Sequence, residues 1–134
     1  MKRVEDLKIV QKFTIQCRLP GLNEVVGANR SNAYMGAALK HKADDAVRWA
    51  IRVAKLKPIK GAAHIKLHFV EQNRRRDPDN IYSAVKFVLD ALVKEGILEN
   101  DSQRILKPPR PIEYSYEIGN VARVDVEIEE AGNE

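Results

Sequence analysis

The chain has 134 residues, enough for one compact domain and too few for two of ordinary size. Hydrophobic residues make up 44% and charged residues 31%, which is typical of a globular protein and excludes a disordered one. The net charge of +4 is unevenly spread, since residues 1–66 carry 14 Lys/Arg against 5 Asp/Glu and residues 67–134 carry 9 against 14. A basic half can meet a polyanion while an acidic half holds a cation, although two solvated surfaces would explain the asymmetry as simply.

Cysteine content and hydropathy indicate the compartment. Cys17 is the single cysteine, so an intramolecular disulfide is excluded and a reducing compartment is favoured. No apolar stretch approaches membrane-spanning length, and residues 1–6 lack the apolar core of a signal peptide. We therefore expect a cytoplasmic protein with no membrane partner. We also expect no small-molecule organic cofactor.

Three segments show the alternation of apolar and polar residues that is typical of strands with one buried face, namely residues 13–19, 62–71 and 123–128. Cys17 shares the buried side of the first, so we interpret it as a small core residue and not as a nucleophile. His64 and His68 share one face of the second but lie about 13 Å apart at strand rise, too far to chelate one metal without another ligand. We interpret both histidines as surface residues.

Two longer segments have helical periodicity. Residues 36–56 place apolar side chains on one stripe and basic ones on the far side, which suits either a solvated surface or phosphate contact (His41, Arg48, Arg52, Lys55). Residues 80–95 form the second helix, with Asp79 or Asn80 as the N-cap and Gly96 as the stop. Residues 20–34 read as a turn with a short helix, and residues 97–111 as a connector.

These elements predict a single α+β domain over residues 1–134, in which two main helices pack on a mixed β-sheet. We expect residues 1–12 and 130–134, at the two ends, to be flexible.

Residues 74–101 are the most informative stretch, because four aspartates and a lysine follow a run of arginines (Arg74, Arg75, Arg76, Asp77, Asp79, Lys86, Asp90 and Asp101). At about 100° per residue, Asp79, Lys86 and Asp90 fall within a narrow arc of the second helix, opposite its apolar stripe. Asp77 leads into this helix, and Asp101 follows the connector that turns back after it.

Each of these residues has an ordinary structural explanation when it is taken alone. Acids stabilise helix N-termini, Lys86 and Asp90 form an i,i+4 pair, and arginines often end a strand at the surface. Gathered on one face, they favour a site for a divalent metal and a phosphodiester. Mg²⁺ takes carboxylate and phosphate oxygens and keeps several waters, and it activates a water for attack. A nearby lysine stabilises the charge that develops on the phosphoryl oxygens.

The ordered motifs of this stretch also carry a resemblance. Asp77-Pro78-Asp79-Asn80, then Lys86 with Asp90-Ala91-Leu92, then Asn100-Asp101, resembles the signature of the RusA family of Holliday junction resolvases. Pro20-Gly21-Leu22-Asn23 is also similar to that family, and the match covers about residues 13–128. The resemblance implies a RusA-like fold and a homodimeric, Mg²⁺-dependent endonuclease, with Mn²⁺ as a substitute. Such an enzyme resolves four-way DNA junctions by paired symmetric nicks in recombination and repair.

The resemblance also assigns roles by position. Asp77, Asp79 and Asp101 resemble the family's essential acids, and Lys86 resembles its catalytic lysine. Asp90 matches the aspartate of the Asp-Ala-Leu motif, either as a fourth metal ligand or as a residue that orients Lys86. Arg74, Arg75 and Arg76, together with Lys86, would contact the DNA backbone.

Two positions depart from the family pattern. The spacing from Asp79 to Asp90 is about one helical turn longer than in the shortest members. Asn100 stands where the family often has an acid. A protein of another class also fits the sequence, namely a non-catalytic DNA-binding module whose acids are helix caps and surface pairs.

Overall fold

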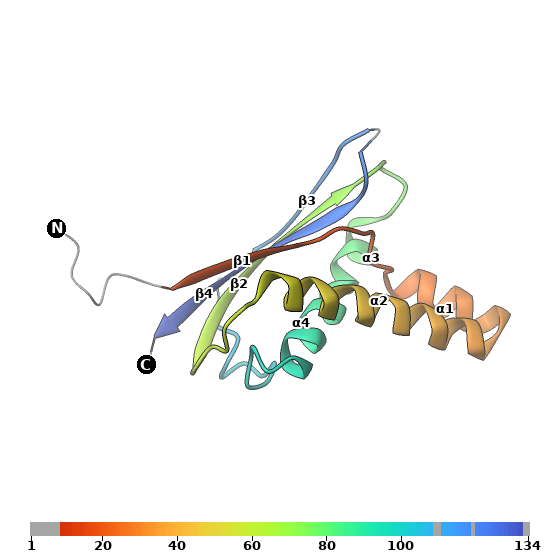
Figure 1. Cartoon of the computed structure of the whole chain (residues 1–134). Helices are drawn as coiled ribbons and strands as arrows, with labels where there is room; N and C mark the ends of the chain where they lie inside the picture. The colour runs from red at the N-terminus through yellow and green to blue at the C-terminus, as the bar shows by residue number, and fades with distance from the viewer. Residues whose placement is uncertain (1–8, 109–110, 119, 133–134) are drawn as a thin grey trace.

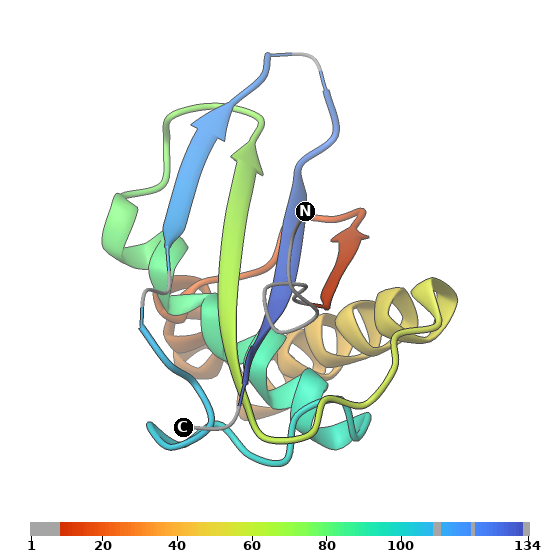
Figure 2. The ribbon, with the colours of Figure 1, turned by 90° about the vertical axis from the view of Figure 1, so that its left-hand side faces the viewer.

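Four strands form one mixed sheet in the computed structural model of the chain, which describes residues 9–108, 111–118 and 120–132. The elements in chain order are β1 (Val10–Ile15), α1 (Leu22–Ser31), α2 (Ala33–Ala54), β2 (Ala62–Glu71), α3 (Pro78–Ser83), α4 (Val85–Lys94), β3 (Ile112–Tyr116) and β4 (Arg123–Gly132). The helices lie on one side of the sheet (Figure 1), and its other face carries no helix (Figure 2). The structure therefore agrees with the predicted α+β class and mixed sheet.

The strand order is β1-β4-β2-β3, so the last strand in the sequence lies between two earlier ones. β4 pairs antiparallel with both neighbours, and its Val126 lies opposite Phe13 of β1 and Leu67 of β2. β2 and β3 are parallel, with Leu67 opposite Ile112. A parallel pair needs a crossover connection, and here that connection consists of α3, α4 and the segment that follows α4.

The core lies between the sheet and the helices α2 and α4. Alternate residues of β2 point into it and are fully buried, as a period-2 pattern requires (Ala63, Ile65, Leu67, Phe69). Val47 and Ile51 of α2 and Val88 and Leu92 of α4 meet them from the helix side. Each aliphatic side chain buried in this way contributes about 1.5–3 kcal/mol to folding. Cys17 is half-buried against this core, as expected, and burial raises the pKa of its thiol.

The second predicted helix differs in detail from its expectation. It begins at Pro78, with Asp77 as the N-cap, because proline fits the first helical position, where its missing N–H is not needed. It is also interrupted at Ala84, so that α3 and α4 follow one another as two short helices. The helix expected at 36–56 is present as α2, and the short helix expected within 20–34 is the ten-residue α1.

The sheet also departs from expectation at three places. β1 ends at Ile15 and not at residue 19, because its partner β4 begins at Arg123, opposite the residue just beyond the Ile15–Val124 pair. β3 was not predicted. Residues 10–12 and 130–132, expected to be flexible, belong to β1 and β4, and the Glu130 N–H donates to the Ile9 carbonyl at 3.0 Å. Residues 1–8 and 133–134 lie outside the described residues.

The histidines expected at the surface are half-buried on the open face of the sheet. His64 Nδ1 lies 3.1 Å from the Lys107 carbonyl oxygen, and His68 Nε2 lies 2.8 Å from the Ser115 hydroxyl. Among the described residues, no helix is both long and apolar enough to cross a membrane.

Candidate functional site

Residues 19–24 and residues 76–83, far apart in the sequence, meet where α1 and α3 begin. The side-chain oxygen of Asn80 accepts from the Asn23 N–H at 3.0 Å, and its amide donates to Glu24 at 2.9 Å. The Ser83 hydroxyl accepts from the Leu22 N–H at 2.8 Å. The first N–H groups of a helix have no hydrogen-bond partner within that helix. Asn80 and Ser83 of α3 therefore supply hydrogen-bond acceptors for the start of α1. The buried Asn80 thus fixes the two helices relative to each other.

Gly21 makes this contact possible. A Cβ at position 21 would lie 2.2 Å from the side-chain oxygen of Asn80 and 2.3 Å from its backbone oxygen. The φ of Gly21 is −94°, which any residue can adopt, so the glycine is required by close approach and not by backbone conformation. The Pro20-Gly21-Leu22-Asn23 motif therefore needs glycine at position 21 because Asn80 of the Asp-Pro-Asp-Asn motif packs against it.

The side chain of Arg76 is buried close to this contact between α1 and α3. Its guanidinium donates to both carboxylate oxygens of Glu71, at 2.8 and 3.0 Å, and also to the Leu19 carbonyl. Its side chain is 5% exposed. The predicted DNA contact therefore needs correction for this residue, because its hydrogen-bonding groups are used within the fold. Arg74 and Arg75 have exposed side chains.

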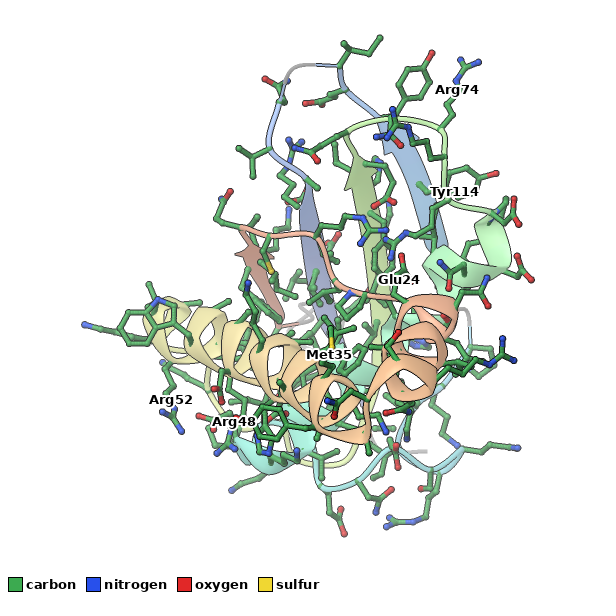
Figure 3. The ribbon with its side chains drawn as sticks, turned by 90° about the vertical axis from the view of Figure 1, so that its right-hand side faces the viewer. Glu24, Met35, Arg48, Arg52, Arg74 and Tyr114 are labelled. Atoms are coloured by element: carbon green, nitrogen blue, oxygen red, sulfur yellow. The ribbon has the colours of Figure 1, made fainter. Side chains whose placement is uncertain are left out.

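The carboxylate of Glu24, at the start of α1, accepts several hydrogen bonds (Figure 3). Partial burial by itself would raise the pKa of Glu24, but hydrogen bonds from Asn80, Arg18 and backbone N–H groups lower it to about 2. The guanidinium of Arg76 also lies 3.7 Å from this carboxylate. Glu24 therefore stays ionised and serves to join α1 to α3.

The two acids of the Asp-Pro-Asp-Asn motif are exposed at the N-terminus of α3. The backbone carbonyl of Asp77 accepts from the N–H groups of Asn80 and Ile81 at 3.0 and 3.1 Å. The side chain of Asp77 makes no capping hydrogen bond. Asp79 lies in the first turn, where the helix dipole favours a negative charge. Both carboxylates are thus accessible to a ligand.

Lys86 and Asp90 form the expected pair one turn apart on α4, with 3.5 Å between Nζ and the nearer carboxylate oxygen. The lysine side chain is 78% exposed and that of Asp90 is 38% exposed. Asp101 is exposed in the turn that follows α4, and Asn100 accepts from the Ser102 N–H at 2.9 Å. Asn100 therefore has a local role as a turn-forming residue.

The predicted metal set is spread over the start of α3, the middle of α4 and the turn after it. Within residues 9–108, 111–118 and 120–132, no group of three or more His, Cys, Asp or Glu residues is spaced to hold a metal ion. Asp77, Asp79, Asp90 and Asp101 are therefore not gathered into a closed cage. The chemistry of Asp77 and Asp79 still fits Mg²⁺, because this ion commonly uses one or two carboxylates and completes its coordination with waters and substrate phosphates.

Two of the basic residues predicted on the outer face of α2, Arg48 and Arg52, form ion pairs within the protein. Glu95, at the end of α4, accepts from Arg48 at 2.8 Å and from Arg52 at 2.6 Å. Hydrogen bonds from Arg52 and then Arg48 lower the pKa of Glu95 to about 2. Asp44 is 3.1 Å from Lys94 and 3.7 Å from Arg48. We call these five residues the α2–α4 ion cluster.

The aromatic residues beside the acids were not predicted from the sequence. Tyr82 of α3 meets Tyr114 of β3 edge to face, with 5.9 Å between ring centroids. Arg74 lies over the ring of Tyr116, 4.2 Å from its centroid. The alternation of residues 112–116, Ile-Glu-Tyr-Ser-Tyr, is the signal that would have found this strand and its tyrosines.

No protein-family model matches the chain, and a search of curated proteins finds no match.

Proposed function

We propose that the chain is a Mg²⁺-dependent, structure-selective endodeoxyribonuclease of the RusA type, which resolves four-way DNA junctions by paired nicks. The supporting observation is the contact between the two segments that carry the resemblance to that family. Asn80 of the Asp-Pro-Asp-Asn motif binds the helix that begins in the Pro-Gly-Leu-Asn motif, and Gly21 gives it room. The contact leaves Asp77 and Asp79 exposed beside it.

In this proposal Asp77 and Asp79 hold the metal, and Asp101 is the third acid that the resemblance implies. When bound, Mg²⁺ neutralises charge on the phosphate and lowers the pKa of a bound water. Lys86 places its ammonium where charge develops on the phosphoryl oxygens. The 3.5 Å contact between Asp90 and Lys86 supports an orienting role for Asp90 more than a role as fourth ligand.

DNA contact falls to the exposed cations near these acids, Arg74, Arg75 and Lys86. Each neutralised phosphate releases counterions, so binding should weaken as salt rises. Cutting two strands symmetrically requires two active sites, so the proposal includes a homodimer with two-fold symmetry.

A non-catalytic DNA-binding module is the second candidate. The position of Asp79 in the first turn of α3 and the ion pair of Lys86 with Asp90 are what a purely structural role would require. The absence of a closed carboxylate cage among the described residues also favours it.

Metal dependence separates the two candidates. The protein is incubated with a four-way junction and with a linear duplex, each with Mg²⁺ and with a chelator, and the strands are resolved on denaturing gels. We expect paired nicks in the junction with Mg²⁺ alone. Junction binding that never becomes cutting would favour the module, and equal cutting of the duplex would indicate a general nuclease.

A further inference from the structure

Three of the four tyrosines in the chain lie together beside the candidate acids. Tyr82 is 40% exposed, Tyr114 is 47% exposed and Tyr116 is 38% exposed. We call these three residues and Arg74 the tyrosine surface. Figure 3 shows Arg74 and Tyr114 toward one end of the molecule, well away from Arg48 and Arg52.

The sheet register sets the direction in which two of these rings point. Tyr114 lies opposite Phe69 of β2, and Tyr116 lies opposite Glu71. Paired residues of neighbouring strands share a face, so both tyrosines lie on the helix side of the sheet. They border a hollow of about 550 Å³, which Pro78 and Ile81 of α3 also line.

Packing in the core does not account for these rings. Phe69 and Ile81 are buried in the core, while each tyrosine keeps more than a third of its surface in water. The edge-to-face contact of Tyr82 with Tyr114, at an interplanar angle of 62°, leaves ring surface uncovered. The cation above Tyr116 is a single exposed arginine on the loop after β2.

The chemistry of this surface matches an unpaired nucleobase. Bases stack on aromatic side chains and on arginine guanidinium planes, and they do so with little dependence on sequence. Arg74, with the neighbouring exposed Arg75, adds the positive charge that a backbone phosphate needs. An apolar peptide would not need these two cations.

The tyrosine surface is also next to the proposed point of cleavage. Asp79 and Tyr82 are three residues apart in α3, and residues at that spacing are neighbours on a helix surface. Pro78, which lines the hollow, lies between Asp77 and Asp79. A base close to a phosphate held at these acids can therefore reach the rings.

We propose that the tyrosine surface stacks a base that is unpaired at the point of strand exchange, and that this contact makes the protein prefer junctions to linear duplex. The inference rests on the proposed function. Taking a base out of a stack costs a few kcal/mol in intact duplex and least where the base is already unpaired. Stacking on tyrosine thus favours the junction without reading sequence.

Photo-crosslinking in a chelator tests the contact without requiring cleavage. A four-way junction carries 5-iodouracil at the point of exchange, and irradiation joins that base to an aromatic ring stacked on it. We expect the adduct, located by mass spectrometry, on Tyr82, Tyr114 or Tyr116. Adducts only on Tyr34, which is 80% exposed on α2, or on no tyrosine, would overturn the proposal.

Binding of the tyrosine variants gives the second measurement. Fluorescence anisotropy compares junction and duplex affinity for the double variant Tyr114→Ala/Tyr116→Ala. We expect its preference for the junction to fall roughly 5- to 150-fold, the range for loss of one base–aromatic stack. The double variant Tyr114→Phe/Tyr116→Phe keeps the rings and the preference, and Tyr34→Ala is the matched control. An unchanged preference in the alanine variant would overturn the inference.

The two proposals fail in different ways. Crosslinking to the tyrosine surface by a protein that never nicks DNA with Mg²⁺ would remove the proposed nuclease and leave the stacking surface in place. Nicking by a protein without these crosslinks would do the reverse.

Discussion

Two charged regions at opposite ends of the helix layer use similar residues differently (Figure 3). In the α2–α4 ion cluster, Glu95 binds both Arg48 and Arg52, and Asp44 binds Lys94, so the charges are matched within the protein. At the start of α3, Arg76 and Glu71 are matched in the same way. Their neighbours Arg74, Arg75, Asp77 and Asp79 remain exposed to solvent. Charge content alone therefore does not separate the two regions, whereas the pairing of the charged side chains within the protein does.

The largest expected effect comes from Asp79. Asp79→Asn keeps the shape of the side chain and removes a charge proposed to hold the metal, so we expect cleavage of the junction to fall about a hundredfold or more. Junction binding should stay the same or tighten, because a carboxylate facing a phosphate opposes binding. Single-turnover nicking and anisotropy measure the two quantities.

The matched control is Asp45→Asn, which alters an exposed aspartate on α2. It should nick as the unmodified chain does. Full nicking activity in Asp79→Asn would contradict the proposed function.

Arg76→Ala tests the buried half of the contrast. It leaves Glu71, which is 8% exposed in its side chain, without its partner in the interior. Breaking a buried ion pair from one side typically costs about 3–5 kcal/mol, so we expect a loss of that size in the free energy of unfolding. Urea denaturation measures it.

Arg75→Ala, at the exposed neighbour, is the comparison and should change stability by less than about 0.5 kcal/mol. Equal effects of the two substitutions would show that the buried and exposed arginines do not differ as the geometry requires.

Gly21→Ala tests the contact between the two motifs. The new methyl group would overlap Asn80, so the helices must separate, at a cost of about 1–3 kcal/mol in unfolding free energy. Gly27→Ala is the matched change within α1, where a Cβ meets nothing within 4 Å. That variant should gain up to about 1 kcal/mol from helix propensity. Thermal denaturation of both variants should give shifts of opposite sign.

Glu95→Gln is expected to have the smallest effect, and it depends on pH. The pKa of Glu95 is about 2 in the folded chain against an ordinary value of 4.5, so its stabilisation is complete above about pH 4.5 and disappears as pH falls toward 2. Because Arg52 is 60% exposed, we expect no more than about 1 kcal/mol at neutral pH.

The melting temperature measured from pH 7 to pH 2 should fall less steeply for Glu95→Gln than for the unmodified chain. Glu99→Gln, which alters a 59% exposed carboxylate, is its control. Parallel curves for Glu95→Gln and the unmodified chain would contradict a stabilising role for this cluster.

Local patterns predicted the elements whose environment is simple. The alternation of residues 62–71 gave the bounds of β2, because one face of that strand is continuously buried. The stripe of residues 36–56 predicted α2 within a few residues. The break at Ala84 coincides with no glycine or proline, so local composition did not predict it.

Contacts between distant segments could not be predicted in this way. β3 forms through parallel pairing with β2, and β1 ends opposite the point where β4 begins, so both depend on partners far along the chain. For the candidate site, the sequence marked Asp77 and Asp79, and the structure finds them exposed together. The sequence could not distinguish the buried Arg76 from the exposed Arg74 and Arg75, because three consecutive arginines differ only in their surroundings in the fold.

The position of β4 has a consequence for synthesis of the chain. β1 and β2 do not pair with each other, and residues 123–132 join them. A chain emerging from the ribosome can therefore complete helices such as α2 early, but it cannot close the sheet until this last strand has left the exit tunnel. Until then β1 has no partner strand and β2 is paired on one side only. We therefore expect the sheet, and the core that it shares with α2 and α4, to form only when translation of this segment is complete.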